Sequence, residues 1–514
     1  MPLLRKKSPE NGTKTKILRR LGNSEKYQLA MYLLDHYRGT IVSCRYRLPY
    51  PFPFILQRKD LINMIHTAIA IAILRNRILQ VGVANADSNA PRWVQLESVR
   101  LSNHIEFGFF DENDEDISKA LDAMIVHELD AKFPELDKRP GWRVIVLWQQ
   151  GIYFVELIFI FSRFHHDGMS GKVFHQNILE YLNNQNGPNA HHARQFIDGD
   201  ILKLPKSSLR LPPPIEKVTK FSITPIFAIK TLWQELKPSI FHREASLAKW
   251  VPIQSTPSKT NIRTFTIEAP EVLKIRTACR EHKTSIAGLL HGLMLASLAS
   301  HLHEETAKAF KSITAINLRP LIPSSPSFEA DQAMANYTTH MSHTFDEELV
   351  REMRPTLDLS IEGYPPLPPD ALDQVWLVSA QVQREIQRKL DRGMKNDNVR
   401  LMRWIPDWKK QISRAARRPR VYSWFVNNVG EVDGRTFGTP WDGGGIQTWN
   451  IIRSQFVMSA KVNSAAFVIS LVTTKGEELC VSGSWQECVM DDKLAHGVIC
   501  DLETWLNQIA SEEP

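Results

Sequence analysis

Two apolar runs, residues 142–148 and 152–161, lie close together in this 514-residue chain, joined by a Gln-Gln-Gly link. Runs of this length, rich in Val, Ile, Phe and Trp and linked by a short glycine-containing turn, are typical of a β-hairpin. The second run continues into FSRFHHDGMSG at residues 161–171, and residues 172–184 have the spacing of an amphipathic helix. The sequence therefore predicts a polar cluster at the end of a strand, where a rigid sheet can hold active-site groups.

This cluster admits more than one chemistry. A histidine titrates near neutral pH and can take a proton from a hydroxyl or thiol, so His165 and His166 are candidates for a general base. A solvated turn is the plain alternative. A metal site is a third interpretation, because His and Asp are ligand types. Neighbouring residues of an extended segment point to opposite faces, and no HExxH or CxxC spacing occurs, so we expect no metal.

The length and composition favour a globular protein with two large domains. A chain of 514 residues is too long for one ordinary core, and 43% hydrophobic with 23% charged residues is ordinary for a soluble protein. Expected strands and helices alternate in both halves, which predicts an α/β fold with helices packed on mixed sheets. We expect a first domain at residues 21–202, a proline-rich crossover at 203–261 and a second domain at 262–514.

The net charge of +7 is partly concentrated in residues 1–20, which we expect to form a disordered, solvated tail. Contact with an anionic membrane surface or with a polyphosphate ligand is the alternative for a tail of this charge. The chain contains no zinc finger, RNA-binding signature or other nucleic-acid module, so we expect no nucleic-acid partner.

Several features favour a cytoplasmic protein, which we expect to be a monomer. No apolar run reaches the roughly 18–20 residues that span a bilayer, and the amino terminus lacks the apolar region of a secretory signal. The apolar and aromatic stretch at residues 221–233 is expected to dock on the protein, with peripheral contact to an organelle membrane as the alternative. The cysteines are odd in number and irregularly spaced, which suits free thiols in a reducing compartment: Cys44, Cys279, Cys480, Cys488 and Cys500.

Six short segments follow one another in an order that resembles the fungal alcohol acetyltransferase family: LGNSEKY, DGMSG, LPPP, NLRP, NNVGEVDG and SWQ. That family is part of the fold group of chloramphenicol acetyltransferase, BAHD acyltransferases and peptide-synthetase condensation domains. The resemblance extends from about residue 21 to residue 506. It implies two chloramphenicol-acetyltransferase-like domains around a tunnel. It also implies O-acylation of an alcohol or natural-product acceptor, with acetyl-CoA as co-substrate, in fungal secondary metabolism.

One residue departs from the family pattern. The family motif is HxxxDG, and its histidine is the general base, but counting back from Asp167 and Gly168 places Arg163 at the histidine position. An arginine stays protonated in proteins and cannot accept the proton. Three alternatives follow. In the first, the base is His166 or His165, and His165 would share a face with position 163 on an extended segment. In the second, the chain has kept the fold only for binding. In the third, Arg163 polarises a carbonyl in a cyclisation without CoA.

The resemblance assigns roles to further residues. It implies that Asp167 is structural and pairs with an arginine from the other half, which here is Arg319. Asn427 or Asn428 is a candidate donor to the tetrahedral oxyanion, with a turn-forming role as the alternative for both. Gly168 permits a tight exit from the strand. Trp449 and Arg453 precede a C-terminal strand that should line the tunnel, and Ser484 and Trp485 are weaker candidates.

Overall fold

The computed structural model describes residues 16–49, 56–110, 117–149, 151–185, 187–205, 210–236, 247–256, 259–323, 325, 328–357, 363–435 and 448–512. Residues 1–15 of the expected tail therefore lie outside the described residues. Strand β1 (Ile17–Arg20) takes up the last part of that segment, because it pairs antiparallel with β4 (Arg92–Gln95).

The apolar hairpin forms as predicted. β7 (Trp142–Gln149) pairs antiparallel with β8 (Phe154–Phe161), and Trp142 lies opposite Phe161. β8 is buried at every position, which explains why its sequence is apolar except for Glu156 rather than alternating, and the buried Glu156 is paired with Arg45. Both strands lie inside a mixed sheet in the order β15-β2-β8-β7-β6, which we call the first sheet. Its other strands are β2 (Thr40–Arg47), β6 (Ile105–Phe110) and β15 (Asn450–Met458).

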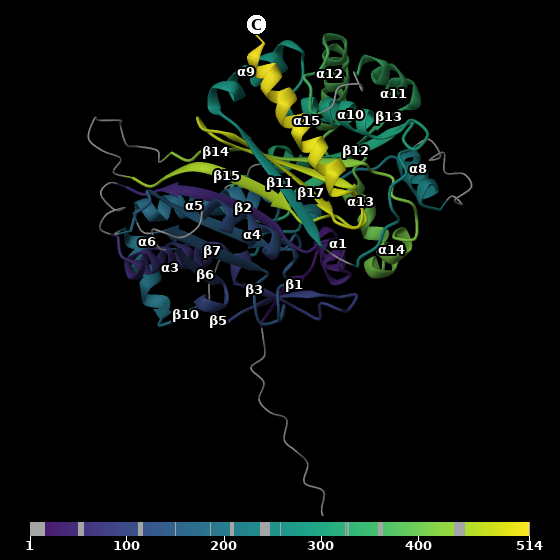
Figure 1. The fold of residues 1–514 in the computed structure, drawn as a ribbon. Helices are drawn as coiled ribbons and strands as arrows, with labels where there is room; N and C mark the ends of the chain where they lie inside the picture. Colours follow the sequence, from purple (N-terminus) through teal and green to yellow (C-terminus); the bar gives the residue numbers. More distant parts are fainter. Residues whose placement is uncertain are drawn as a thin grey trace, which may run out of the picture.

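Helices pack around the first sheet (Figure 1). α5 (Gly168–Asn183) follows β8 and packs against α3 (Arg58–Arg75) and β2. Short strands form small sheets in the orders β1-β4-β3 and β5-β10-β9. The remaining elements of this half are α1 (Asn23–Leu33), α4 (Ile117–Asp130), α6 (Pro188–Phe196), β3 (Val81–Ala84), β5 (Ser98–Arg100), β9 (Ile197–Asp198) and β10 (Ile201–Lys203).

The second half is built on another mixed sheet, the second sheet, in the order β11-β17-β16-β14-β12-β13. Its strands are β11 (Thr260–Ile267), β12 (Phe310–Asn317), β13 (Thr338–Phe345), β14 (Trp424–Val432), β16 (Phe467–Thr474) and β17 (Leu479–Gln486). The predicted α/β class with mixed sheets is confirmed. The helices of the second half are α9 (Ala269–Glu281), α10 (Ile286–His301), α11 (Glu347–Met353), α12 (Pro369–Asp391), α13 (Asn398–Leu401), α14 (Trp408–Ala415) and α15 (Asp492–Ser511).

α10 is the central helix of this half. Ser285 caps it, because its hydroxyl accepts a hydrogen bond from the Gly288 N–H at 3.2 Å. The helix is apolar on almost every face and is correspondingly buried, with α12 and α15 packed against it. Turns of 3₁₀ helix occur at Arg77–Gln80, Leu101–Asn103, Arg319–Leu321, Arg354–Thr356 and Met402–Trp404.

β15 belongs to the second half in sequence but to the first sheet in space (Figure 1). It pairs antiparallel with β2, with Ser454 opposite Cys44. Asn183, at the end of α5, holds the chain where it enters β15: its amide donates to the Trp449 carbonyl at 3.0 Å and its Oδ1 accepts from the Trp449 N–H at 2.8 Å. The first sheet thus takes a strand from well beyond the domain boundary expected at residue 262.

β14 faces both halves. Trp424 and Val426 pack in the core around α10 and α15, whereas Phe425 packs with residues of the first half. Strand side chains alternate between faces, so Asn427 lies on the same face as Phe425. We call this contact layer the seam; on the second sheet it is lined by Phe425, Asn427, Val468 and Cys480.

The crossover contains α7 (Ile215–Val218) and α8 (Pro225–Leu236). Three apolar side chains of α8 are open to solvent, with exposed fractions of 80% for Ile226, 68% for Ile229 and 61% for Trp233. The expectation that this stretch docks on the protein is wrong for these side chains. Within the described residues, no helix has the length and apolar character to cross a membrane.

Candidate active site

Asp167 lies at the junction between the turn after β8 and the start of α5. Its backbone is extended, with φ −117° and ψ −179°, and it caps α5 by accepting the Ser170 N–H at 2.9 Å. A carboxylate here also interacts favourably with the helix dipole. Gly168 begins the helix, and a Cβ at this position would lie 3.0 Å from side-chain atoms of Val429 and Phe456. The glycine thus allows α5 to approach β14 and β15 closely.

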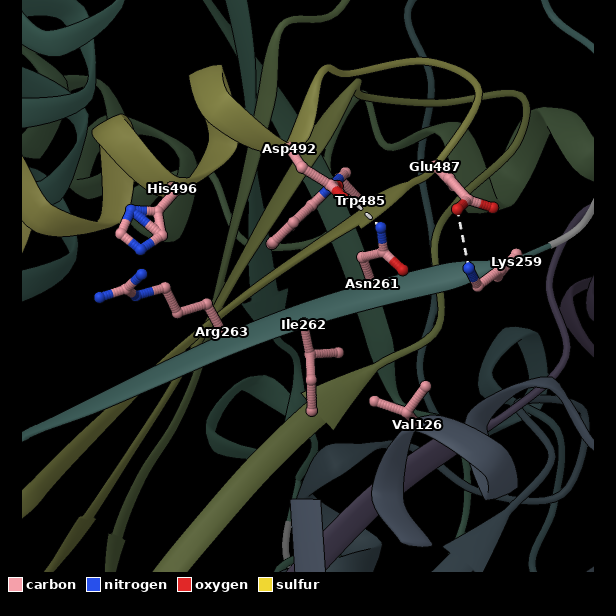
Figure 2. Close-up of a pocket in the computed structure, with 9 residues that line it drawn as sticks. All are labelled: Val126, Lys259, Asn261, Ile262, Arg263, Trp485, Glu487, Asp492 and His496. Atoms are coloured by element: carbon pink, nitrogen blue, oxygen red, sulfur yellow. Dashed lines mark hydrogen bonds and ion pairs between the residues drawn. The ribbon is translucent and has the colours of Figure 1, made fainter. Parts of the chain in front are cut away.

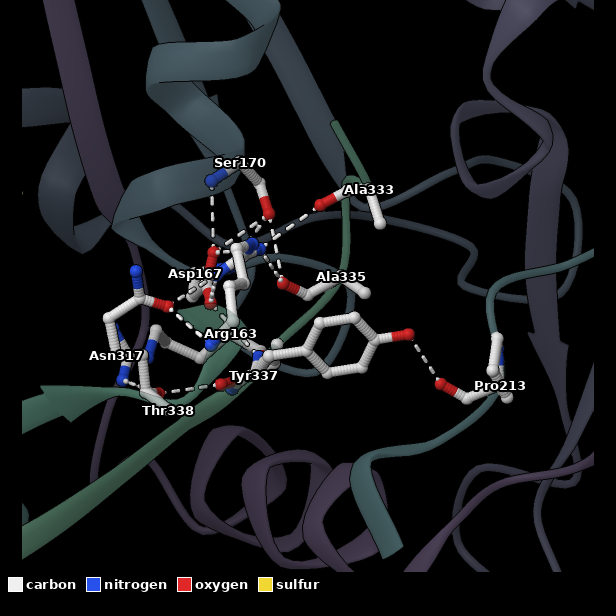
Figure 3. Close-up of polar contacts among 11 residues, drawn as sticks. Arg163, Asp167, Ser170, Pro213, Asn317, Ala333, Ala335, Tyr337 and Thr338 are labelled. Carbon is white, nitrogen blue, oxygen red and sulfur yellow. Dashed lines mark hydrogen bonds and ion pairs between the residues drawn. The ribbon is translucent and has the colours of Figure 1, made fainter. Parts of the chain in front are cut away.

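Arg319 reaches Asp167 from the second half. Its Nη1 donates to Oδ2 at 2.7 Å and its Nη2 to Oδ1 at 3.0 Å, and both side chains are fully buried. The Tyr337 N–H donates to Oδ2 at 2.9 Å (Figure 3). Burial alone raises the pKa of Asp167, but the Arg319 guanidinium and these hydrogen bonds outweigh it and hold the pKa below its ordinary value.

The chain before β13 completes this arrangement. Arg319 also donates to the carbonyls of Ala333 at 3.0 Å and Ala335 at 2.8 Å. The Tyr337 hydroxyl donates to the Pro213 carbonyl at 2.8 Å, which ties the LPPP segment to the same place (Figure 3). A bidentate pair with further bonds on both partners fixes orientation as well as distance, so the DG turn is held rigidly against the second half.

His165 points away from the seam. Residues 163–165 form a turn rather than an extended segment, so the expected common face of His165 and Arg163 does not exist. The His165 ring lies 2.8 Å from the Ser162 hydroxyl through Nδ1 and packs edge-on against Trp93, with ring centroids 4.6 Å apart. Burial lowers the pKa of His165 to about 3.

His166 is fully buried beside Phe159 and Phe161. Neither of its ring nitrogens has a hydrogen-bond partner among the described residues. Burial, with smaller contributions from neighbouring groups, holds the pKa of His166 well below its ordinary value. The ring is therefore a neutral imidazole that would need a substrate group to reach it before it could act as a base.

Arg163 extends towards β13 instead. Its Nη2 donates to the Thr338 hydroxyl at 3.4 Å, and its backbone carbonyl accepts the Asn336 amide at 2.9 Å. Only 7% of Arg163 is exposed. Burial lowers the pKa values of His340 and Lys461, and the positive charge of Arg163 adds to both effects.

The two candidate asparagines have different environments. Asn427 is 3% exposed, and its side-chain NH₂ group has no hydrogen-bond partner among the described residues. Asn428 is exposed, and its side-chain oxygen accepts the Gly430 N–H at 2.7 Å, as in a local turn. A buried unpaired donor is costly in a folded protein, and Asn427, unlike Asn428, has a buried donor that among the described residues is still open to a partner.

The remaining candidates are spread over the seam. Ser484 is 1% exposed, and its hydroxyl is likewise without a partner in the part of the chain that the structure describes. Ser470 on β16 is also 1% exposed, and its hydroxyl also has no partner among the described residues. Sequence reasoning did not identify it, because an isolated serine in a strand gives no signal. Arg453 forms an ion pair with Glu478 at 3.0 Å. Trp449 is buried and anchored to Asn183.

Sequence reasoning also missed Lys461, Thr338 and His340. His340 is exposed to solvent, yet the protein around it lowers its pKa to about 4 by desolvation. Thr338 and His340 lie on β13 and Lys461 lies on the loop between β15 and β16, so no single local motif could have revealed the three together.

A surface groove of about 490 Å³ lies where α4 meets the edge of the second sheet (Figure 2). Val126 of α4 lines one side, and Arg263 of β11 and His496 of α15 line the other. The Asp130 carboxylate accepts both the Thr260 N–H at 2.7 Å and its hydroxyl at 2.8 Å, which holds the two halves together beside the groove.

No cluster of His, Cys, Asp and Glu that could hold a metal occurs among the described residues.

The comparisons with known proteins fit this geometry. Residues 95–347 match the family model described as alcohol acetyltransferase. The resemblance to the alcohol acetyltransferase family is confirmed. The chain is 25% identical to the Fusarium pseudograminearum protein named "Probable alcohol acetyltransferase FCK4", over 98% of this chain and 97% of that protein. It is 24% identical to "Probable alcohol acetyltransferase crmB" of Aspergillus fumigatus, over 93% of this chain and 96% of that protein.

Solved structures share the fold of this acetyltransferase-like chain. The TRI3 trichothecene 15-O-acetyltransferase of Fusarium sporotrichioides superposes with a TM-score of 0.67 at 12% identity, over 96% of this chain and 95% of that one. The condensation domain of the monacolin K polyketide synthase MokA superposes with a TM-score of 0.56 at 9% identity, over 96% of this chain and 97% of that one. At these identities the likeness shows the fold, and it places the chain in the expected fold group.

Proposed function

We propose that this protein is an O-acyltransferase that moves an acyl group, with acetyl as the first candidate, from acyl-CoA to an alcohol. The acceptor is a small-molecule alcohol or natural product of fungal secondary metabolism. The observation that carries the proposal is Asn427, whose buried amide donor has no partner in the part of the chain that the structure describes and lies on the seam of an acyltransferase fold. The match to the alcohol acetyltransferase family supports it.

The chemistry follows from what the reaction requires. The alcohol oxygen attacks the thioester carbonyl, the hydroxyl proton passes to a base, and a tetrahedral oxyanion develops. Asn427 donates its amide N–H to that oxyanion, and such a donor is more effective in a site that excludes water. The C–S bond then breaks, and the leaving thiolate takes up a proton. The Asp167–Arg319 pair contacts no reacting atom and holds the DG turn in place.

The seam has groups that fit acyl-CoA as a co-substrate. The thioester supplies the activated acyl group, and its carrier arm is rich in amides and hydroxyls. Asn427, Ser470 and Ser484 each present a buried polar group without a partner among the described residues. Hydrogen bonds to such a ligand would satisfy these groups.

The proposal also covers location and assembly. The protein is a cytoplasmic monomer that touches a membrane surface through α8. Ile226, Ile229 and Trp233 have the spacing of one helical stripe, and the exposed amine of Lys230 lies beside them. An apolar stripe with Trp and Lys at its border suits the headgroup region of an anionic bilayer.

The first experiment measures thiol release from acetyl-CoA with a panel of alcohols, together with acetyl-CoA binding by calorimetry. Turnover with at least one alcohol is the expected result for the native protein. Arg163→His, which restores the family's histidine, is the informative variant. A native protein that neither binds acetyl-CoA nor turns over would overturn the proposal. A native protein that binds acetyl-CoA but is silent, with activity in Arg163→His, would point to a binding role.

A further inference from the structure

Lys461 lies on the loop between β15 and β16, and its backbone is held on both sides. The Ser464 N–H donates to the Lys461 carbonyl at 3.2 Å, and the N–H of the next residue, Val462, donates to the His36 carbonyl at 3.1 Å. The amine nitrogen lies 4.0 Å from the ring centroid of Phe425 and 5.8 Å from that of Tyr37. Phe425 is two residues before Asn427 on the same strand face, so the amine lies over the seam.

This amine has no acidic partner in the part of the chain that the structure describes. Within the described residues no hydrogen bond or ion pair involves Lys461 Nζ, although exposed lysines such as Lys475 do have carboxylate partners. The titratable and charged groups around it are Arg163 in the turn before α5, Tyr37 after α1, His340 on β13 and Arg420, whose Nη1 donates to the Lys461 carbonyl at 3.4 Å. None of these supplies a negative charge at neutral pH, because burial raises the pKa of Tyr37 to about 12 and leaves its phenol protonated.

The surroundings of this half-buried amine favour its neutral form. Burial and the positive charge of Arg163 hold the pKa of Lys461 well below its ordinary value. A neutral amine can accept a proton, whereas Arg163 at the family's histidine position cannot. The aromatic faces of Phe425 and Tyr37 would stabilise the ammonium once it forms, through cation–π contact.

We propose that the Lys461 amine accepts the proton of the acceptor hydroxyl; this rests on the proposed acyl transfer. The O–H bond breaks and an N–H bond forms, which gives an ammonium. The oxygen forms its bond to the acyl carbon and the C–S bond breaks. The ammonium then returns its proton to the thiolate, which leaves as CoA. Arg163 is a positioning residue in this scheme, since it disfavours protonation of the amine before the alcohol arrives.

The test compares Lys461→Met, which removes the amine, with Lys475→Met, the same change at an exposed lysine paired with Asp433. Lys461→Met is expected to lower kcat at least about 100-fold, the usual contribution of a general base. Binding of acetyl-CoA by calorimetry should be unchanged. Adding methylamine to Lys461→Ala should restore part of the activity, and the restored rate should rise with the free amine concentration. A Lys461→Met protein with native kcat would overturn the inference.

A second measurement does not depend on turnover. Competitive labelling with trace acetic anhydride, followed by mass spectrometry, reports how each amine titrates in the full chain. Lys461 should reach its limiting reactivity at a lower pH than Lys475 does. Equal titration of the two lysines would overturn the inference even in a protein without detectable turnover. If the native protein binds no acetyl-CoA while Lys461 still titrates early, the proposed function fails and the assignment of a neutral amine stands.

Discussion

Arg319 forms a bidentate ion pair with Asp167 between the two halves of the molecule, at 2.7 and 3.0 Å, with no solvent access to either side chain. The carboxylate belongs to the DG turn after β8 and the guanidinium to the turn after β12. Because a buried charge without its partner is strongly unfavourable, each residue depends on the other.

We therefore predict strong coupling between these positions. Asp167→Ala or Arg319→Ala alone should lower the free energy of unfolding by about 3–5 kcal/mol, because each leaves one uncompensated buried charge. The double variant should lose much less than the sum of the single losses. Chemical denaturation of the four proteins measures the cycle. Additive losses would contradict the pairing as a source of stability.

The acid stability of the fold should depend on His165. Its pKa is about 3 in the folded protein, below the ordinary value near 6.5, so the folded state binds the proton less readily than the unfolded state. The stability it contributes is present above about pH 6.5 and is lost as pH falls towards 3. His165→Gln, which cannot protonate, should flatten this part of the pH profile of unfolding.

The two adjacent asparagines provide a matched comparison. Asn427→Ala should lower kcat by about 100- to 1,000-fold, the effect of removing an oxyanion donor. Asn428→Ala should retain near-native kcat, since that side chain is exposed and bonds only within its own turn. Steady-state kinetics with saturating acetyl-CoA separates the two. Equal kcat in both variants would remove Asn427 from the proposed mechanism.

Membrane contact through α8 is open to a direct test. Replacing Ile226, Ile229 and Trp233 with serine should abolish co-sedimentation with vesicles that contain phosphatidylserine, because it removes the exposed apolar stripe. Thiol release in free solution should not change, since α8 lies outside the seam. A control replaces the exposed Leu377 of α12 with serine and should bind vesicles like the native protein. Vesicle binding that survives the triple substitution would exclude α8 as the contact.

Local sequence was sufficient wherever neighbouring residues decide the structure. The apolar hairpin and the DG turn that starts α5 both follow from periodicity, capping and turn chemistry that act over a few residues. The family resemblance rested on motifs of the same kind. It also indicated Arg319 as the partner of Asp167, which the structure places against it.

Only the tertiary structure decided the rest. The sequence could not distinguish Asn427 from Asn428, show that His165 points at Ser162 and Trp93, or place β15 in the first sheet. In the sequence, Lys461 is an ordinary lysine of a loop. Folding brings its amine close to Phe425 and Tyr37 and exposes it to the charge of Arg163. The physical reason is that burial and electrostatic environment depend on residues distant in sequence. The same side chain is inert or reactive according to which of them folding brings within reach.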